Sequence, residues 1–194
     1  MKRMERLRKK CLQQGDQLVF FDPAHQVHNS SNDYAWQFKG SAGTKKIKAN
    51  TGRRRINIIG GVNAITMKVS TLITEKNCDK YTVTEFMGKL RRQYRGNKKI
   101  YMILDNARYN RSEAVRVKAK ACNIELIYLP PYCPNLNLIE RLWKFFKKKV
   151  VQNKYYEKFD SFEQAIIQFF ANIQKHRGEL QSLLNFKFGI IKAI

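Results

Sequence analysis

Three of the 15 acidic residues stand where carboxylates could act together. Asp22 follows the apolar run 18–21, Asp105 follows the apolar run 100–104, and Glu140 lies in a segment with an apolar helical face. A carboxylate at the end of a hydrophobic strand is partly desolvated, and this costs free energy unless a cation or hydrogen bonds compensate. Carboxylate oxygens suit Mg²⁺ or Mn²⁺, and two such ions about 4 Å apart can promote phosphodiester displacement. We therefore predict a two-ion site in which Asp22, Asp105 and Glu140 are both metal ligands and catalytic residues.

Each of these acids also has a purely structural interpretation. Aspartate is common in turns at strand ends, so either aspartate alone favours a turn role. Two aspartates after apolar strands in one short chain favour a paired metal site instead. Asn137 and Glu140 have the spacing of a helix cap with its N3 glutamate, so position alone does not make Glu140 catalytic.

The charge of the chain indicates a polyanionic partner. The 194 residues include 38 Lys and Arg, which gives a formal net charge of +23. Hydrophobic residues make up 43% of the chain, enough for a real core, so a disordered basic tail is excluded. No apolar run approaches the roughly 20 residues of a membrane span, and the N-terminus has no apolar signal segment. Nucleic acid is the leading candidate partner, and a membrane is not.

The basic residues are banded along the sequence rather than spread evenly. Most of them fall in five segments: 2–10, 39–55, 89–99, 108–120 and 141–149. Any one band could be only a solvated surface, because phosphate contacts carry no distinctive sequence signal. Lys144, Lys147 and Lys148 share a helical face with Glu140, so they are predicted DNA contacts. Arg108 is a further candidate, and Asn106 could orient a metal ligand or a phosphate.

The elements that must position these residues follow from the hydrophobic pattern. Residues 1–16 are predicted to be a basic linker or helix, and 17–194 a single α/β domain. An antiparallel meander is predicted first, and its strands are 18–21 (stopped by Pro23), 34–40, 55–62 and 66–74. Thr82 and Glu85 then form a capping-box signature that opens a helix. The remaining predicted elements are a strand at 99–104, a helix at 112–122, a strand at 124–129, a helix at about 138–150 and a helix from 160. This order predicts a mixed sheet with helices on its faces.

Other residues that could do chemistry have simpler interpretations. Cys11, Cys78, Cys122 and Cys133 form no C-x-x-C pair, so reduced thiols are expected. His25 and His28 have H-x-x-H spacing, but no second pair completes a tetrahedral site. Trp36 and Trp143 are predicted to be core residues rather than surfaces for base stacking.

Several of these residues together resemble a known family. Asp22 after an apolar strand, the sequence Asp-Asn-Ala at 105–107, and the run Leu-Pro-Pro-Tyr-Cys-Pro-Asn-Leu-Asn-Leu-Ile-Glu-Arg-Leu-Trp at 129–143 are similar to DDE transposases. The resemblance is to the bacterial insertion-sequence branch of the mariner-type superfamily. The 34 residues between Asp105 and Glu140 match the spacing typical of that branch. The resemblance covers roughly residues 17–180, and the segment 129–143 is its most specific part.

The resemblance implies an RNase H-like fold with a mixed five-stranded sheet. In that fold the first Asp lies on the first strand, the second Asp ends the fourth strand, and the Glu comes from the helix after the fifth. It also implies Mg²⁺-dependent or Mn²⁺-dependent cleavage of double-stranded DNA at transposon ends, then transfer of the freed 3′-hydroxyl into target DNA. Such enzymes usually act as homodimers on paired ends, and a bacterial one would work in the cytoplasm at the nucleoid.

Full-length relatives also carry N-terminal helix-turn-helix modules, whereas here only about 16 residues precede the first strand. A fragment, a second reading frame joined by frameshifting and a degenerate copy would each have this sequence. Two other functions therefore remain open at this stage. One is a non-catalytic remnant that only binds DNA, and the other is an RNase H-like nuclease acting on RNA–DNA hybrids or junctions.

Overall fold

The computed structural model describes residues 2–29, 31, 48–130 and 137–184. Its strands are β1 (Gln17–Val27), β2 (Arg55–Asn63), β3 (Val69–Thr74), β4 (Ile100–Leu104) and β5 (Ile124–Tyr128). Its α-helices are α1 (Lys2–Gln14), α2 (Lys80–Gln93), α3 (Glu113–Ala121), α4 (Ile139–Phe146), α5 (Phe159–Ala171) and α6 (Arg177–Leu183). Two 3₁₀ turns, η2 (Arg108–Arg111) and η5 (Ile173–His176), and a π-helical turn, η4 (Lys147–Val151), complete the list.

These strands form one mixed sheet in the order β3-β2-β1-β4-β5. The pairs β1–β2 and β2–β3 are antiparallel, whereas β1–β4 and β4–β5 are parallel. The predicted α/β class, with a meander followed by parallel strands, is therefore confirmed. The strand predicted at 34–40, Trp36, Cys133 and most of the proline-rich loop lie outside the described residues.

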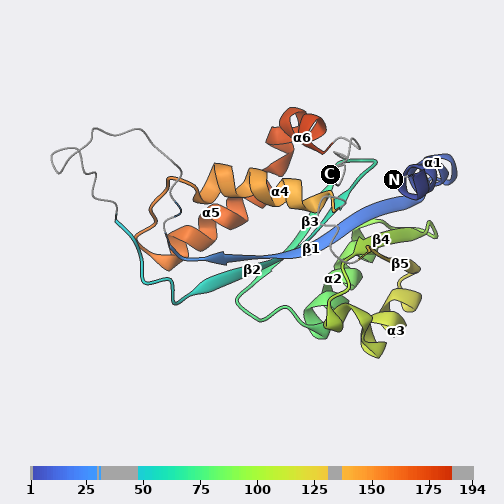
Figure 1. Cartoon of the computed structure of the whole chain (residues 1–194), viewed down its shortest axis with the longest axis horizontal. Helices are drawn as coiled ribbons and strands as arrows, with labels where there is room; N and C mark the ends of the chain where they lie inside the picture. The colour runs from blue at the N-terminus through green and yellow to red at the C-terminus, as the bar shows by residue number, and fades with distance from the viewer. Residues whose placement is uncertain (1, 30, 32–47, 131–136, 185–194) are drawn as a thin grey trace, which may run out of the picture.

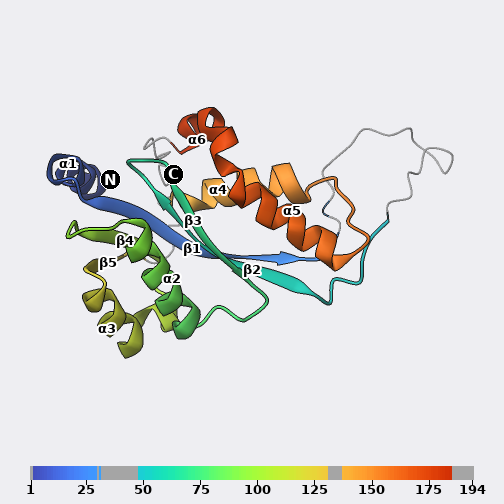
Figure 2. The same cartoon turned by 180° about the vertical axis from the view of Figure 1, so that it is seen from behind.

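Each face of the sheet carries its own hydrophobic core. Helices α2 and α3 lie on one face, and α4, α5 and α6 lie on the other (Figure 1). Alternation along β1 supplies both cores, because Leu18 and Phe20 pack on the α4 side while Val19 and Phe21 pack on the α2 side. Helix α1 lies beside the start of β1, as the reverse view shows (Figure 2), and it buries Cys11 in the α4-side core.

Strand β1 does not stop at Pro23 but continues to Val27, so that prediction was wrong. Pro23 pairs with Ile59 of β2. The parallel pairing with β4 ends at Phe20, so Pro23 lies where β1 has a strand neighbour on one side only. A proline lacks the N–H that a central strand must donate, but it is tolerated where one side is unpaired.

The start of α2 also differs from the prediction. The capping box joins Asp79 to Thr82 rather than Thr82 to Glu85, because the Asp79 carboxylate accepts hydrogen bonds from the N–H groups of Tyr81 and Thr82. The helix therefore begins about one turn earlier than predicted, and the Asp79 side chain caps its first free N–H groups. Among the described residues, no helix combines the length and apolar composition needed to cross a membrane.

Candidate active site

Asp22 of β1 and Asp105, which follows β4, occupy equivalent positions just beyond the last paired residues of these two parallel strands. Phe20 of β1 lies opposite Ile103 of β4, and each aspartate follows two residues later. Alternation along β1 puts Asp22 on the same side as Phe20 and Ala24, which pack in the core beneath α4. The parallel register thus brings together two acids that are far apart in sequence.

The Asp105 carboxylate is held by the turn that follows it. Its Oδ1 atom accepts hydrogen bonds from the Ala107 backbone N–H (3.1 Å) and from Asn110 Nδ2 (2.7 Å). Asn110 is fully buried, and its backbone carbonyl oxygen accepts a hydrogen bond from the Tyr128 hydroxyl of β5 (2.9 Å). The turn η2 therefore folds back over the end of β4 and orients the carboxylate. Sequence reasoning gave Asn110 no role, although its place five residues after Asp105 was visible.

The Asp22 carboxylate is partly buried, and among the described residues its side-chain donor is Trp143 of α4. The Trp143 indole Nε1–H donates to Asp22 Oδ2 at 3.2 Å. Burial raises the pKa of Asp22 to about 7, and the nearby negative charges of Asp105 and, less strongly, Glu140 act in the same direction. The indole hydrogen bond opposes this rise. Trp143 is in the core, as predicted, but its N–H also reaches a candidate ligand, which the hydrophobic pattern did not indicate.

Glu140 lies in the first turn of α4, on the helix that covers Asp22. Burial raises the pKa of its carboxyl group, and the positive charge of Lys144 one turn later opposes that rise. The helix-cap interpretation of Asn137 was wrong, because the N-cap residue is Leu138 and no side chain caps this helix. The Asn137 amide instead donates to the Phe21 carbonyl of β1 at 3.4 Å, next to Asp22.

The donor set suits a hard divalent cation. Mg²⁺ is commonly held by only one or two carboxylates and keeps several waters, and the pair Asp22 and Asp105 provides two. Burial and the nearby negative charge of Asp105 raise the pKa of Asp22, and a bound cation would offset the cost of ionising it. Within the described ranges no group of three or more His, Cys, Asp or Glu side chains is gathered closely enough to hold a metal. The two aspartates therefore form the centre of the candidate site, and Glu140 flanks it.

Asn106 connects the ends of two strands next to this site. Its Nδ2 donates to the Leu129 carbonyl at 2.6 Å, and its Oδ1 accepts a hydrogen bond from Arg111. Arg108 is exposed and lines a separate pocket of about 380 Å³ together with Tyr109. Their use in DNA contact or metal-ligand orientation stays a prediction.

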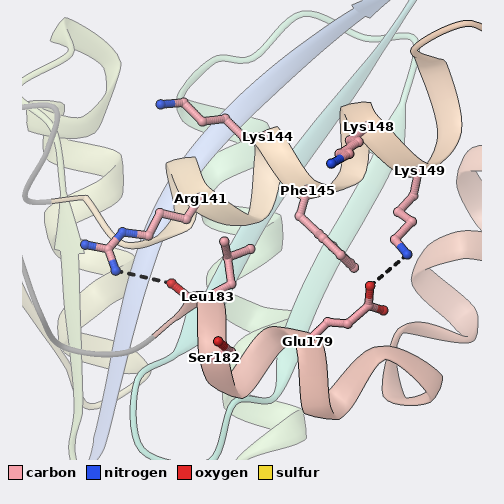
Figure 3. A pocket seen from close by; sticks show the side chains of 8 residues that line it. All are labelled: Arg141, Lys144, Phe145, Lys148, Lys149, Glu179, Ser182 and Leu183. Atoms are coloured by element: carbon pink, nitrogen blue, oxygen red, sulfur yellow. Dashed lines mark hydrogen bonds and ion pairs between the residues drawn. The ribbon is translucent and has the colours of Figure 1, made fainter.

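A basic cleft of about 830 Å³ lies between the α4–η4 segment and α6 (Figure 3). Its cationic lining residues are Arg141, Lys144, Lys148 and Lys149. Contacts that cross the cleft include a hydrogen bond from Arg141 Nη1 to the Leu183 carbonyl (3.2 Å) and an ion pair between Lys149 and Glu179 (2.7 Å). Lys144 and Lys148 are exposed, so they can contact a ligand. Lys147 is also exposed, but it does not line this cleft.

Comparison with known families identifies this arrangement. The sequence profile of the DDE superfamily endonucleases matches residues 17–163, which span β1 through the first turns of α5 and include all three acids. The chain belongs to the DDE superfamily of endonucleases. The predicted family is thereby confirmed.

Solved structures of Mos1 transposase share the fold of this endonuclease domain. The Mos1 strand transfer complex matches 97% of this chain and 59% of its own, with a TM-score of 0.66 and 14% identity. A Mos1 mariner paired-end complex with Mn matches 97% and 61%, with a TM-score of 0.66 and 13% identity. The isolated catalytic domain of Mos1 mariner transposase matches 93% and 84%, with a TM-score of 0.59 and 13% identity. The RNase H-like architecture is therefore confirmed.

A bacterial relative matches part of the chain. An uncharacterized protein, y4pE/y4sA of Sinorhizobium fredii (strain NBRC 101917 / NGR234), is 28% identical over 83 residues, which are 43% of this chain. The matched residues are 59% of that protein, and the Mos1 strand transfer chain is likewise matched over 59% of its length. This DDE endonuclease chain thus spans about three-fifths of these relatives.

Proposed function

We propose that this chain is the catalytic domain of a DDE transposase. It would cleave DNA phosphodiester bonds at transposon ends and join the freed 3′-hydroxyl to target DNA, with Asp22, Asp105 and Glu140 as its catalytic carboxylates. The observation that carries the proposal is the parallel register of β1 and β4, which aligns Asp22 with Asp105 beneath the helix that bears Glu140. Membership of the endonuclease family and the Mos1 fold support it.

In this proposal the three acidic side chains bind the metal ions, and a neighbouring amide orients one of these acids. Asp22 and Asp105 would be ligands of the two Mg²⁺ or Mn²⁺ ions, and Glu140 of α4 would be the third ligand residue. The bound ions would lower the pKa of the attacking hydroxyl and stabilise charge on the leaving oxygen. Asn110 keeps the Asp105 carboxylate oriented, because its buried amide donates to Oδ1. The Mos1 paired-end complex with Mn supports this choice of ion.

Double-stranded DNA is the proposed substrate, both as transposon end and as target. Lys144 and Lys148, with Lys147 beside them, would contact its phosphates near Glu140, and Arg108 and Asn106 would do so near Asp105. The Mos1 relatives were solved as paired-end and strand transfer complexes, which supports a homodimer that holds two ends. We place this activity in the bacterial cytoplasm, at the nucleoid.

The test is metal-dependent nicking or strand joining with Asp105→Asn, which keeps the shape of the side chain but removes its charge. Activity should fall by more than about 100-fold because a carboxylate ligand is lost. Asp160→Asn is the matched control, since Asp160 is an exposed acid on α5 and its loss should leave activity unchanged. Wild-type activity in Asp105→Asn would overturn the assignment.

Two other outcomes would select the alternative functions. Salt-sensitive DNA binding with no cleavage at any Mg²⁺ or Mn²⁺ concentration would identify a non-catalytic remnant. Cleavage of RNA–DNA hybrids in preference to duplex DNA would identify a different RNase H-like nuclease.

A further inference from the structure

Gly60 of β2 is directly opposite Asp22 in the sheet, and its missing side chain makes room for Trp143. A Cβ atom at Gly60 would lie 2.4 Å from Trp143 Cη2 and 2.8 Å from Cζ2. Real Cβ contacts are essentially never that short, and the obstacle is a rigid ring. The indole can therefore approach the strand this closely only because residue 60 is glycine.

This position directs the N–H edge of the Trp143 indole toward the Asp22 carboxylate. Trp143 is only 6% exposed, and its Nε1–H donates to Asp22 Oδ2 at 3.2 Å. Phe170 of α5 packs edge-on against the indole, with ring centroids 6.2 Å apart. Gly60 below and Phe170 beside it leave the ring little freedom to turn, so the hydrogen bond fixes the direction of one Asp22 oxygen.

The chemical type of this donor matters. An indole N–H donates one hydrogen bond and carries no charge, so it orients a carboxylate without neutralising it. A Lys or Arg in the same place would offset the negative charge that attracts a divalent cation. Trp143 also lies one turn after Glu140 on α4, so the helix that carries one candidate ligand orients another.

We propose that Trp143 is a positioning residue for Asp22 and that Gly60 is the residue whose lack of a side chain allows it to act. This inference rests on the proposed role of Asp22 as a metal ligand. It adds a requirement that the carboxylate be pre-oriented by a neutral donor before the cation arrives.

The first experiment removes the N–H while keeping the shape. Benzothienylalanine, in which sulfur replaces the indole N–H, would be incorporated at position 143 of the full chain. Mn²⁺ affinity would then be measured without DNA by electron paramagnetic resonance. Loss of an outer partner of a metal ligand commonly weakens metal binding 10–100-fold, so we expect roughly a 10-fold weaker Mn²⁺ affinity with an unchanged unfolding temperature. Unchanged Mn²⁺ affinity would overturn the proposal.

The second experiment displaces the ring while keeping the N–H. Gly60→Ala should weaken Mn²⁺ affinity by a similar factor. Gly61→Ala is the matched control, because its Cβ would meet Val19 at 2.9 Å and Phe86 at 3.0 Å in the core of the opposite face. Both substitutions should lower the unfolding temperature, but only Gly60→Ala should weaken Mn²⁺ binding. Equal weakening by both would reduce the effect to general destabilisation and contradict the proposal.

A third readout separates this inference from the proposed function. The chain has two tryptophans, so Trp36→Phe leaves one indole N–H signal in a nitrogen–proton NMR spectrum of the metal-free protein. Asp22→Asn in that background should shift this signal, since the acceptor loses its charge. A shift in a protein that neither binds Mn²⁺ nor cleaves DNA would refute the proposed function and still support the positioning contact. An unshifted signal would refute the contact itself.

Discussion

At Asp22, burial and neighbouring charge act on one carboxyl group in the same direction. Its pKa is raised from the ordinary 3.8 to about 7 in the absence of metal. Between these two values the folded protein keeps a proton that the unfolded chain has already lost. Folding stability therefore falls as pH rises from about 4 to about 7, and the full loss persists above pH 7. A bound divalent cation would offset this loss of stability.

Asp22→Asn should stabilise the metal-free protein at pH 8, because the amide carries no charge to bury. The gain should be about 4 kcal/mol in the free energy of unfolding, because the pKa rises from 3.8 to about 7 and each pKa unit corresponds to roughly 1.4 kcal/mol. At pH 4, where the carboxyl is protonated in the fold, the two proteins should unfold at nearly the same temperature. Thermal unfolding in a chelator at both pH values measures this. A gain that is equal at pH 4 and pH 8 would contradict the electrostatic origin.

The same substitution should reduce the stabilisation that the protein gains from a bound metal ion. Wild-type protein at pH 8 should gain stability on addition of Mn²⁺, because the ion binds only the folded state. Asp22→Asn should gain much less. Titration of the unfolding temperature against Mn²⁺ concentration measures the difference, and equal gains in the two proteins would mean that Asp22 is not a ligand.

Among the elements, the start of α2 shows how a local signal can be misassigned by one turn. The capping box of Asp79 and Thr82 satisfies N–H groups that a start at Thr82 would have left outside the helix. These hydrogen bonds also lower the pKa of Asp79, first through the Thr82 N–H. Helix α2 packs Val83, Phe86 and Met87 against the sheet face opposite α4, so its start sets how that core is covered.

Asp79→Ala should lower the free energy of unfolding by about 1 kcal/mol, the usual effect of losing an N-cap side chain. Glu85→Ala is the informative comparison, because the sequence pattern pointed to Glu85 as the capping partner although it is an exposed residue inside the helix. Its removal should change stability by less than about 0.5 kcal/mol. Urea unfolding of both variants measures this, and a larger effect for Glu85→Ala would reverse the assignment of the cap.

On the scale of the whole molecule, basic residues lie on both faces of the sheet. The net charge of +23 includes the cations of the α4–α6 cleft, next to the helix that carries Glu140. Other basic residues lie on α3, on the opposite side of the sheet (Figure 1). DNA held for cleavage should therefore contact the first set more than the second.

Salt dependence of DNA binding can separate the two faces. Lys144→Gln with Lys148→Gln should reduce the slope of log affinity against log salt by about 2, since each phosphate contact contributes about 0.9. Lys118→Gln with Lys120→Gln on α3 removes the same charge and should leave the slope unchanged. Fluorescence anisotropy over a series of salt concentrations measures both. Equal slope changes would show that DNA binds by net charge alone, without using the cleft.

The sequence by itself determined the fold class and the family, and it singled out three acids as candidate site residues. Asp22 and Asp105 became candidates because an acid that follows an apolar run is a local pattern, and Glu140 because it lies in the specific run 129–143. Strand and helix periods are also local, so most elements were predicted to within a few residues.

Only the tertiary structure decided how those acids are held. The alignment of Asp22 with Asp105, the Asn110 hydrogen bond and the Trp143 indole over Gly60 all depend on register and packing. The continuation of β1 through Pro23 likewise depends on which side of that strand is paired. The Trp143 and Gly60 contacts join residues up to 121 positions apart, and their geometry is set by the register of the sheet and the placement of α4 rather than by a nearby sequence pattern.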